Sequence, residues 1–132
     1  MRALGDLIAA YVDMYSSSSG YSRPIAQLRS SILDNYRSAA YDLEEAIRSL
    51  PFHYDYIRGR FKKEIGMSPL QYLTGLRMKN AEQLLSIREA NGYTVREIAE
   101  MCGFDNALYF SRVFKKHYGC SPSEFCEKQK EN

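Results

Sequence analysis

Apolar side chains recur every three or four residues along most of the chain, which is the spacing of one face of an α-helix. From residue 25 to residue 85 they form four successive stripes: Ile25, Leu28, Ile32 and Tyr36; Leu43, Ala46, Ile47 and Leu50; Tyr54, Ile57, Phe61 and Ile65; Leu70, Leu73, Leu76 or Arg77, Ala81, Leu84 and Leu85. No stretch alternates apolar and polar positions as a half-buried strand does. We therefore expect an all-α fold.

Helix-capping residues fall where helices are expected to begin. Ser68-Pro69 predicts the start of a long helix, because serine accepts hydrogen bonds from free backbone N–H groups and proline suits the first helical position. Thr94 and Glu97 have the spacing of a capping box, which predicts a further helix. Ser121-Pro122 opens a last short helix in the same way. The glycines expected to end helices are Gly66, Gly92, Gly103 and Gly119.

The chain repeats a motif at a distance of 53 residues. The run F-K-K-x-x-G-x-S-P-x-x-aromatic occupies residues 61–72 and again residues 114–125, and the agreement extends back to Tyr56 and Tyr109. Each copy predicts a short helix, a brief turn and a second helix with lysines near its end, which is the plan of a helix-turn-helix. The second helix of that motif enters the major groove of DNA.

A predicted helix of 18 residues, 70–87, connects the two copies. At 1.5 Å per residue it is about 27 Å long, and two recognition helices on one face of DNA lie about 34 Å apart. With the width of the flanking units added, we expect recognition helices near 53–65 and 106–118 to contact two neighbouring segments of one major groove. This divides the chain into residues 1–20, a first helix-turn-helix unit at 21–70, the linker helix at 70–87 and a second unit at 88–132.

The first 20 residues differ from the rest. Leu4, Ile8, Tyr11 and Tyr15 form one helical stripe, and a serine-rich linker, 16–20, follows it. We interpret this segment as the tail of a missing sensor or dimerisation domain. A homodimer would then form either through residues 1–15 or through that missing domain.

Composition argues against several classes of protein. Three cysteines without a CxxC pair or a Cys/His cluster indicate reduced thiols in the cytosol rather than disulfides or a zinc site. No apolar run approaches the roughly 18 residues of a transmembrane helix. The sequence has neither a phosphate-binding glycine loop nor a plausible Ser/His/Asp set. We expect no enzyme activity, no cofactor, no metal and no membrane partner.

The net charge of +2 is weak support for a nucleic-acid partner, but the distribution of charge is stronger support. Residues 54–79 contain six basic and two acidic residues, and residues 106–119 contain three basic residues and no acidic one. Residues 80–105 reverse the sign, with two basic and five acidic residues. Basic charge is therefore concentrated in two blocks, each of which contains a predicted recognition helix.

Two long motifs resemble a known family. Residues 61–85 (F-K-K-x-x-G-x-S-P-x-x-Y-L-x-x-x-R-M-x-x-A-x-x-L-L) are similar to the linker region of the AraC/XylS family of bacterial transcription regulators, and residues 95–116 (V-x-E-I-A-x-x-C-G-F-D-N-x-x-Y-F-S-R-x-F-K-K) resemble its second unit. The resemblance implies a seven-helix domain of two homeodomain-like units that binds double-stranded DNA and activates or represses transcription in the bacterial cytoplasm. It also implies RNA polymerase as a further partner, and an effector-binding or dimerisation domain in front of the chain.

Outward-facing side chains of the two recognition helices are the candidates for DNA contact. Arg58 and Arg112 would read guanine, because a guanidinium binds O6 and N7 together, and Asp55 would accept from cytosine N4. Ala107 and Leu108 offer apolar contact to thymine methyl groups. The remaining candidates are Asn106 and Ser111 for bases and Lys62, Lys63, Lys115 and Lys116 for phosphates.

Several of these residues have a plainer alternative. Asn106 either reads adenine or caps its helix, and the lysine pairs either bind phosphate or complement the helix dipole. Arg77 either pairs with a carboxylate, which we favour, or contacts DNA. Gly59 stands where the family often has a long polar side chain, so it either permits close approach of DNA or leaves its helix reading few bases. His53 and His117 are interpreted as surface or capping residues.

Two other functions compete with sequence-specific DNA binding. A helical protein-interaction module that has lost DNA binding would keep the core and lose the outward basic residues, which this chain retains. Binding to DNA without sequence preference would show as binding that salt abolishes and that no sequence favours.

Overall fold

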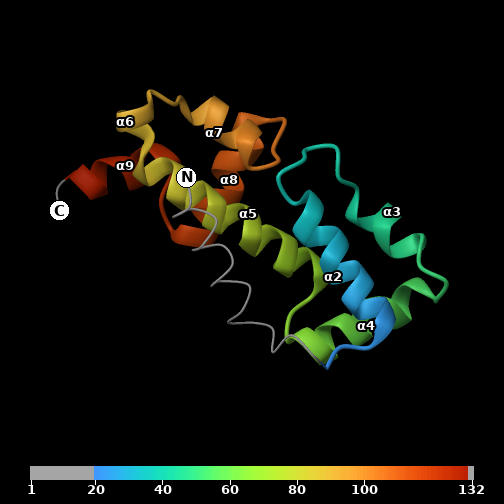
Figure 1. The fold of residues 1–132 in the computed structure, drawn as a ribbon. Coiled ribbons are helices and arrows are strands. Elements are labelled where there is room, and N and C mark those ends of the chain that lie inside the picture. The colour runs from blue at the N-terminus through green and yellow to red at the C-terminus, as the bar shows by residue number, and fades with distance from the viewer. Residues whose placement is uncertain (1–19, 131–132) are drawn as a thin grey trace. The chain divides into compact units, whose positions relative to one another are not determined.

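The computed structural model describes residues 20–130, and within this range it contains eight helices and no strand. The helices are α2 (Arg23–Asn35), α3 (Leu43–Arg48), α4 (Tyr54–Ile65), α5 (Pro69–Ser86), α6 (Arg88–Asn91), α7 (Val95–Met101), α8 (Ala107–Tyr118) and α9 (Pro122–Lys130) (Figure 1). The all-α prediction is confirmed. The described range has one helix more than the seven that the resemblance implies, because α6 forms a separate turn of four residues after α5. The predicted stripe of residues 4–15 and all but the last residue of the serine-rich linker lie outside the described residues.

The described chain forms two compact units. Unit 1 comprises residues 20–36 and 40–76, and unit 2 comprises residues 37–39 and 77–130. Helix α5 is shared, because its residues up to Leu76 belong to unit 1 and those from Arg77 belong to unit 2. Each unit contains one copy of the predicted helix-turn-helix.

The core of unit 1 is built from α2, α3, α4 and the first half of α5. Ile25, Leu28 and Ile32 of α2 are at most 1% exposed, which confirms the first predicted stripe. Phe61 of α4 is fully buried, and its ring meets that of Tyr72 edge-on with 5.7 Å between the ring centroids. These contacts hold α4 so that its opposite side faces solvent.

One predicted core position is wrong. Leu70, assigned to the stripe of the long helix, is 63% exposed. The buried face of α5 within unit 1 runs through Tyr72, Leu73 and Leu76. With 3.6 residues per turn, Leu70 lies about 160° around the helix from Tyr72 and therefore leaves the core.

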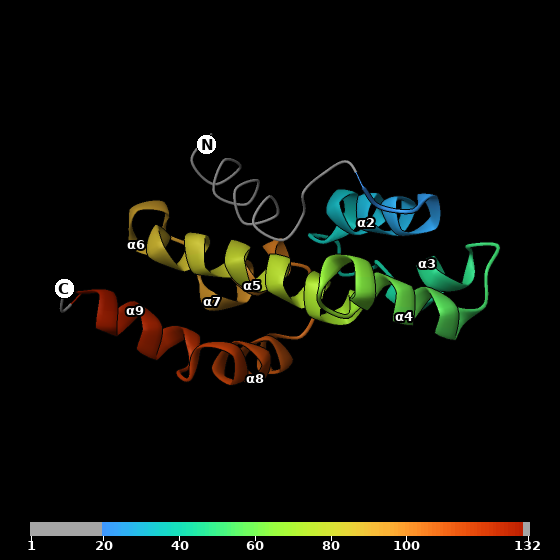
Figure 2. The ribbon, with the colours of Figure 1, turned by 90° about the horizontal axis from the view of Figure 1, so that it is seen from below.

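The core of unit 2 contains a connected set of aromatic rings. Phe110 and Phe114 of α8 are fully buried, with 5.9 Å between their centroids. Phe104, in the turn before α8, lies 5.3 Å from Phe110, and Phe125 of α9 meets Phe114 edge-on at 5.5 Å. Helix α8 thereby packs against both α7 and α9 (Figure 2).

Polar contacts join the second half of α5 to the rest of unit 2. The single proton of the Tyr118 hydroxyl is shared between two acceptors, Oε2 of Glu82 at 2.9 Å and the Met78 carbonyl oxygen at 3.1 Å. The buried Asn80 amide donates to Sγ of Cys102 at 3.7 Å. Burial raises the pKa of the Cys102 thiol to about 12 despite two nearby arginines, so this thiol stays protonated and unreactive at neutral pH.

The predicted caps are present in both copies of the repeat. Ser68 Oγ accepts from the Gln71 N–H at 3.1 Å, and Ser121 Oγ accepts from the Glu124 N–H at 3.1 Å. Thr94 and Glu97 form the predicted capping box at the start of α7. Helices α4 and α8 end at glycines in the left-handed conformation, with φ of 97° at residue 66 and 82° at residue 119, and a side chain there would be strained.

Candidate nucleic-acid interface

Helices α4 and α8 are built in the same way. Each has 12 residues, each follows a side-chain cap, and each ends at a left-handed glycine. Their bounds differ by 53 residues at both ends, which is the distance of the sequence repeat. A residue of α4 and the residue 53 positions later in α8 therefore occupy equivalent places in the two helices.

The outward face of α4 carries most of the residues predicted for it. Asp55, Arg58, Lys62 and Lys63 are exposed, and Gly59 lies among them on the same surface. The helix contains four basic and two acidic residues, which leaves it a net charge of +2. Both lysines lie in its last turn, where cations are also favoured by the helix dipole.

The outward face of α8 is more basic and more apolar than that of α4. Leu108, Arg112, Lys115 and Lys116 are exposed, and Leu108 is 73% exposed. This helix has three basic residues and no acidic one, hence a net charge of +3 with histidine neutral. The two candidates that the structure only half exposes are Ala107 and Ser111.

The capping alternative for Asn106 is confirmed. Its Oδ1 accepts from the Leu108 N–H at 2.9 Å and from the Tyr109 N–H at 3.0 Å. Reading adenine with both ends of the amide would require this oxygen as well as the nitrogen. Such a contact would cost both cap bonds, so the cap is the first role of this residue.

The equivalent position in unit 1 is His53, and it is also a cap. Its Nδ1 accepts from the Asp55 N–H at 3.2 Å. The capping role proposed for this histidine is confirmed, and His117 is exposed at the end of α8, as expected of a surface residue. A single, longer bond makes the His53 cap weaker than the Asn106 cap.

The two arginines of α4 differ in how they contact their neighbours within unit 1. The Arg58 guanidinium carbon lies 5.7 Å from the centroid of the Tyr54 ring, and Arg48 approaches the same ring at 4.6 Å. Arg60 donates from Nε to Glu64 Oε2 at 2.6 Å. Of the outward arginines of α4, Arg58 is therefore the one exposed toward solvent, whereas Arg60 is engaged along the helix.

Glu64 connects α4 to the start of α2. Its two carboxylate oxygens accept from the backbone N–H of Ser22 at 2.7 Å and from the Ser22 hydroxyl at 2.6 Å. Partial burial alone would raise the pKa of Glu64, but the two Ser22 bonds and the adjacent Arg60 outweigh it and hold the pKa below its ordinary value. The carboxylate thus stays ionised and fixes the orientation of α4 within unit 1.

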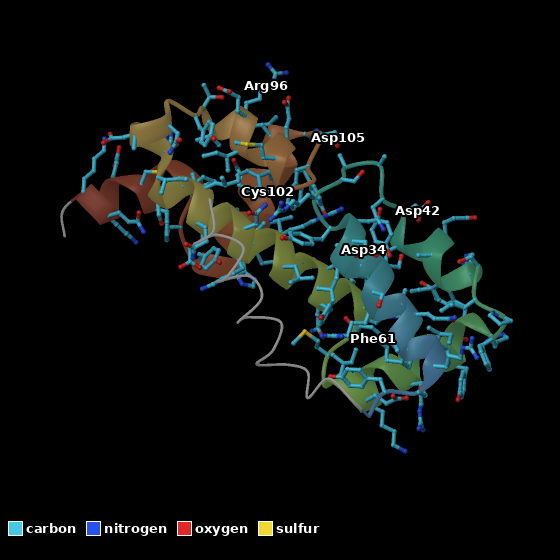
Figure 3. The ribbon with its side chains drawn as sticks, in the orientation of Figure 1. Asp34, Asp42, Phe61, Arg96, Cys102 and Asp105 are labelled. Atoms are coloured by element: carbon cyan, nitrogen blue, oxygen red, sulfur yellow. The ribbon has the colours of Figure 1, made fainter. Side chains whose placement is uncertain are left out.

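Arg77 makes two contacts in unit 2. Its Nη2 donates to the Ser38 carbonyl oxygen at 3.0 Å, and its guanidinium carbon lies 5.5 Å from the centroid of the Phe104 ring. These contacts tie residues 37–39 to α5 and to the turn before α8. Figure 3 marks that turn at Asp105 and marks Cys102 at the end of α7.

The structure exposes aromatic residues that sequence reasoning did not assign to the surface. Tyr56 and Tyr109, at equivalent positions of α4 and α8, are 51% and 58% exposed. Phe52, just before α4, is 47% exposed and stacks on Tyr56 at 5.8 Å. The signal was available for Tyr56, because it directly precedes Ile57 and so lies off the apolar stripe of its helix.

Neither a metal-binding cluster nor a membrane-spanning helix occurs among residues 20–130. Within residues 20–130 no group of three or more His, Cys, Asp or Glu side chains is arranged to hold a metal ion. In the same range no helix has the length and apolar character needed to cross a membrane.

A family model described as a helix-turn-helix domain matches residues 48–128. An uncharacterized transcriptional regulatory protein of Bacillus subtilis, YesN, is 47% identical over 76 residues, which cover 57% of this chain and 20% of that protein. Three other curated relatives are covered over 23% to 38% of their length. The chain therefore spans well under half the length of these relatives.

Solved structures show the same architecture. The C-terminal domain of AraT, a response regulator from Geobacillus stearothermophilus, is 31% identical with a TM-score of 0.73, covering 83% of this chain and 88% of that one. The DNA-binding domain of AdpA, solved in complex with a target DNA, is 26% identical with a TM-score of 0.69, covering 81% of this chain and 93% of that one. The helical arrangement described above is thus shared with a domain whose structure contains DNA.

Proposed function

The chain belongs to the AraC/XylS family of helix-turn-helix transcription regulators, and from this premise we propose that it binds two neighbouring segments of one DNA major groove, with α4 and α8 as its recognition helices. We propose further that the chain is the DNA-binding part of a regulator, that it has no enzymatic role, and that it acts in the bacterial cytoplasm.

One observation carries this proposal: the two equivalent 12-residue helices each end in an exposed lysine pair and carry an exposed arginine. A lysine pair at one helix end is ordinarily explained by the helix dipole. Its recurrence at equivalent places in two helix-turn-helix units is better explained by a partner with regularly spaced negative charge. Double-stranded DNA is such a partner, with one negative charge per roughly 1.7 Å of helix axis.

The proposed base contacts lie on the first two turns of each recognition helix. Arg58 and Arg112 would bind guanine, and Asp55 would accept from cytosine. Leu108, whose side chain is 73% exposed, would meet a thymine methyl group. The other proposed base contacts are Ala107, Ser111 and the amide nitrogen of Asn106.

The proposed phosphate contacts are the exposed lysines in the last turns of α4 and α8, namely Lys62, Lys63, Lys115 and Lys116. Such contacts position the protein and strengthen binding to every sequence, with little information about bases. A homodimer through residues 1–15 or a domain in front of them, and a contact with RNA polymerase, are further predictions from family membership.

The direct test is selection of bound duplexes from a random DNA library by the full chain at two salt concentrations. We expect a recovered site with two defined blocks about 10 base pairs apart. Replacing Lys115 by Ala should weaken binding to all sequences and lower the salt dependence by about one released counterion. Lys128→Ala, an exposed lysine of α9 outside both recognition helices, is the matched control and should change neither.

Two results would count against the proposal. Weak binding that higher salt abolishes, without any enriched sequence, would leave only a phosphate-binding scaffold. Absence of DNA binding at low salt by the folded chain would favour the helical protein-interaction module instead.

A further inference from the structure

Gly59 and Arg112 occupy equivalent positions of the two recognition helices. They are 53 residues apart, and both lie on the exposed face of their helix. Arg112 forms no ion pair within the described residues, so its guanidinium is available to a ligand. The two units therefore differ at the position where unit 2 carries its proposed guanine contact.

The fold gives no reason for a glycine at residue 59. The residue lies inside α4, and a Cβ built on it would meet no atom within 4 Å. Its φ is outside the left-handed region that would favour glycine. Because glycine is among the least favourable residues in a helix interior, it weakens α4 without relieving any clash.

Neighbouring side chains do not substitute for an arginine at this position. Arg58, the proposed guanine contact of α4, is one residue away and about 100° around the helix, so it does not occupy the position that Arg112 has in α8. Arg60 is bonded to Glu64. The centre of the exposed face of α4 thus lacks the long basic side chain that α8 presents at the same place.

We infer that residue 59 is a vacant base-reading position, so that unit 1 reads fewer base pairs than unit 2. This inference rests on the proposed function, because it assumes that both recognition helices enter the major groove. Its consequence is an asymmetric binding site, with one sharply defined block under α8 and one loosely defined block under α4.

The test is duplex selection with the full chain and a reciprocal pair of variants, Gly59→Arg and Arg112→Gly. For the natural chain we expect two blocks of unequal definition, and Arg112→Gly should relax the choice at one base pair of the sharper block. Arg112→Ala also removes the guanidinium and destabilises the helix less, so it provides the same test if the glycine variant does not fold. Gly59→Arg should add a guanine preference to the loose block of roughly 5- to 150-fold.

Two further substitutions at residue 59 separate base recognition from the effect of an added positive charge and from the effect of a larger side chain. Gly59→Lys adds a charge without the forked donor, so it should tighten binding to all sequences and add a smaller guanine preference than Gly59→Arg does. Gly59→Ala should raise the melting temperature and leave DNA affinity unchanged, because only the helix is affected.

Any one of three results would contradict the inference without contradicting the proposed function. The natural chain could select two equally defined blocks, Gly59→Arg could bind DNA without any new base preference, or Gly59→Ala could bind DNA more weakly than the natural chain. The last result would show that DNA approaches the backbone of α4 closely at this residue. If the folded natural chain binds no DNA, both the proposed function and this inference are wrong.

Discussion

The turn before α4 and the turn before α8 differ in the burial of their aromatic ring. In unit 2, Phe104 is 6% exposed and packs on Phe110 of the core. The equivalent position in unit 1 is Pro51, and the aromatic residue comes one position later, at Phe52, which is 47% exposed. Both turns nevertheless have five residues and deliver recognition helices of equal length.

This difference shows which positions of the repeat are needed for the fold. The helix-turn-helix frame is set by buried aromatics, N-caps and left-handed glycines, which recur in both units. The turn and the outward face contribute less to the frame, and there the two units differ: one buries Phe104 and has Arg112, and the other exposes Phe52 and has Gly59. Four predictions test this division between a shared frame and divergent surfaces.

The largest effect is expected from the two buried phenylalanines. Phe61→Ala and Phe114→Ala should each destabilise the protein by about 3–5 kcal/mol, through lost burial and the cavity left behind. Phe114 should cost more, because its ring has three aromatic neighbours within the described residues whereas Phe61 has one, and such pairs add roughly 0.5–1.5 kcal/mol each. Urea unfolding followed by circular dichroism measures both changes.

Lys63→Ala is the control for this pair, since the side chain is exposed and should shift the urea midpoint little. A Phe61→Ala variant that is as destabilised as Phe114→Ala, or more so, would contradict the ranking by aromatic neighbours.

The second-largest effect is expected in DNA binding, from a substitution on the outward face of α8. Arg112→Ala should cost about 1–3 kcal/mol of binding free energy on the preferred site and relax the choice at one base pair. Fluorescence titration against the preferred duplex and against duplexes changed at single base pairs measures it. Equal loss on all duplexes would show that Arg112 contacts phosphate, and would remove the guanine contact proposed for this residue.

Much of the frame could be predicted from the sequence, because its signals are local. Ser68, Thr94 and Ser121 cap helices through atoms three residues away, and the repeat indicates the ends of both recognition helices. Leu70 could not be placed correctly from its spacing, since the buried face of α5 depends on where Tyr72 packs against Phe61. The DNA contacts remain predictions, because an outward position says only that a side chain is available.

The third effect compares the caps of the two recognition helices. Asn106→Ala removes an oxygen that accepts two bonds at 2.9 and 3.0 Å, and should cost about 1–2 kcal/mol of unfolding free energy. His53→Ala removes one bond of 3.2 Å and should cost less. Replacing each by Ser, another good capping residue, should restore most of the loss. Equal losses at the two caps would mean that bond number does not determine cap strength here.

The smallest effect is a dependence on pH that belongs to unit 1. The pKa of Glu64 in the folded state lies below its ordinary value of 4.5, because the Ser22 and Arg60 contacts outweigh partial burial. Its contribution to stability is therefore complete above pH 4.5 and is lost as the pH falls through the lowered pKa. Glu64→Gln should flatten the fall of the unfolding free energy across that window, in urea titrations at pH 7, 4.5 and 3.

The equivalent residue of unit 2 is His117, so His117→Gln should leave the slope below pH 4.5 unchanged. An equally steep fall in the Glu64→Gln variant would show that the acid sensitivity comes from other carboxylates, such as Glu124, whose pKa is also lowered by its bonds to Ser121.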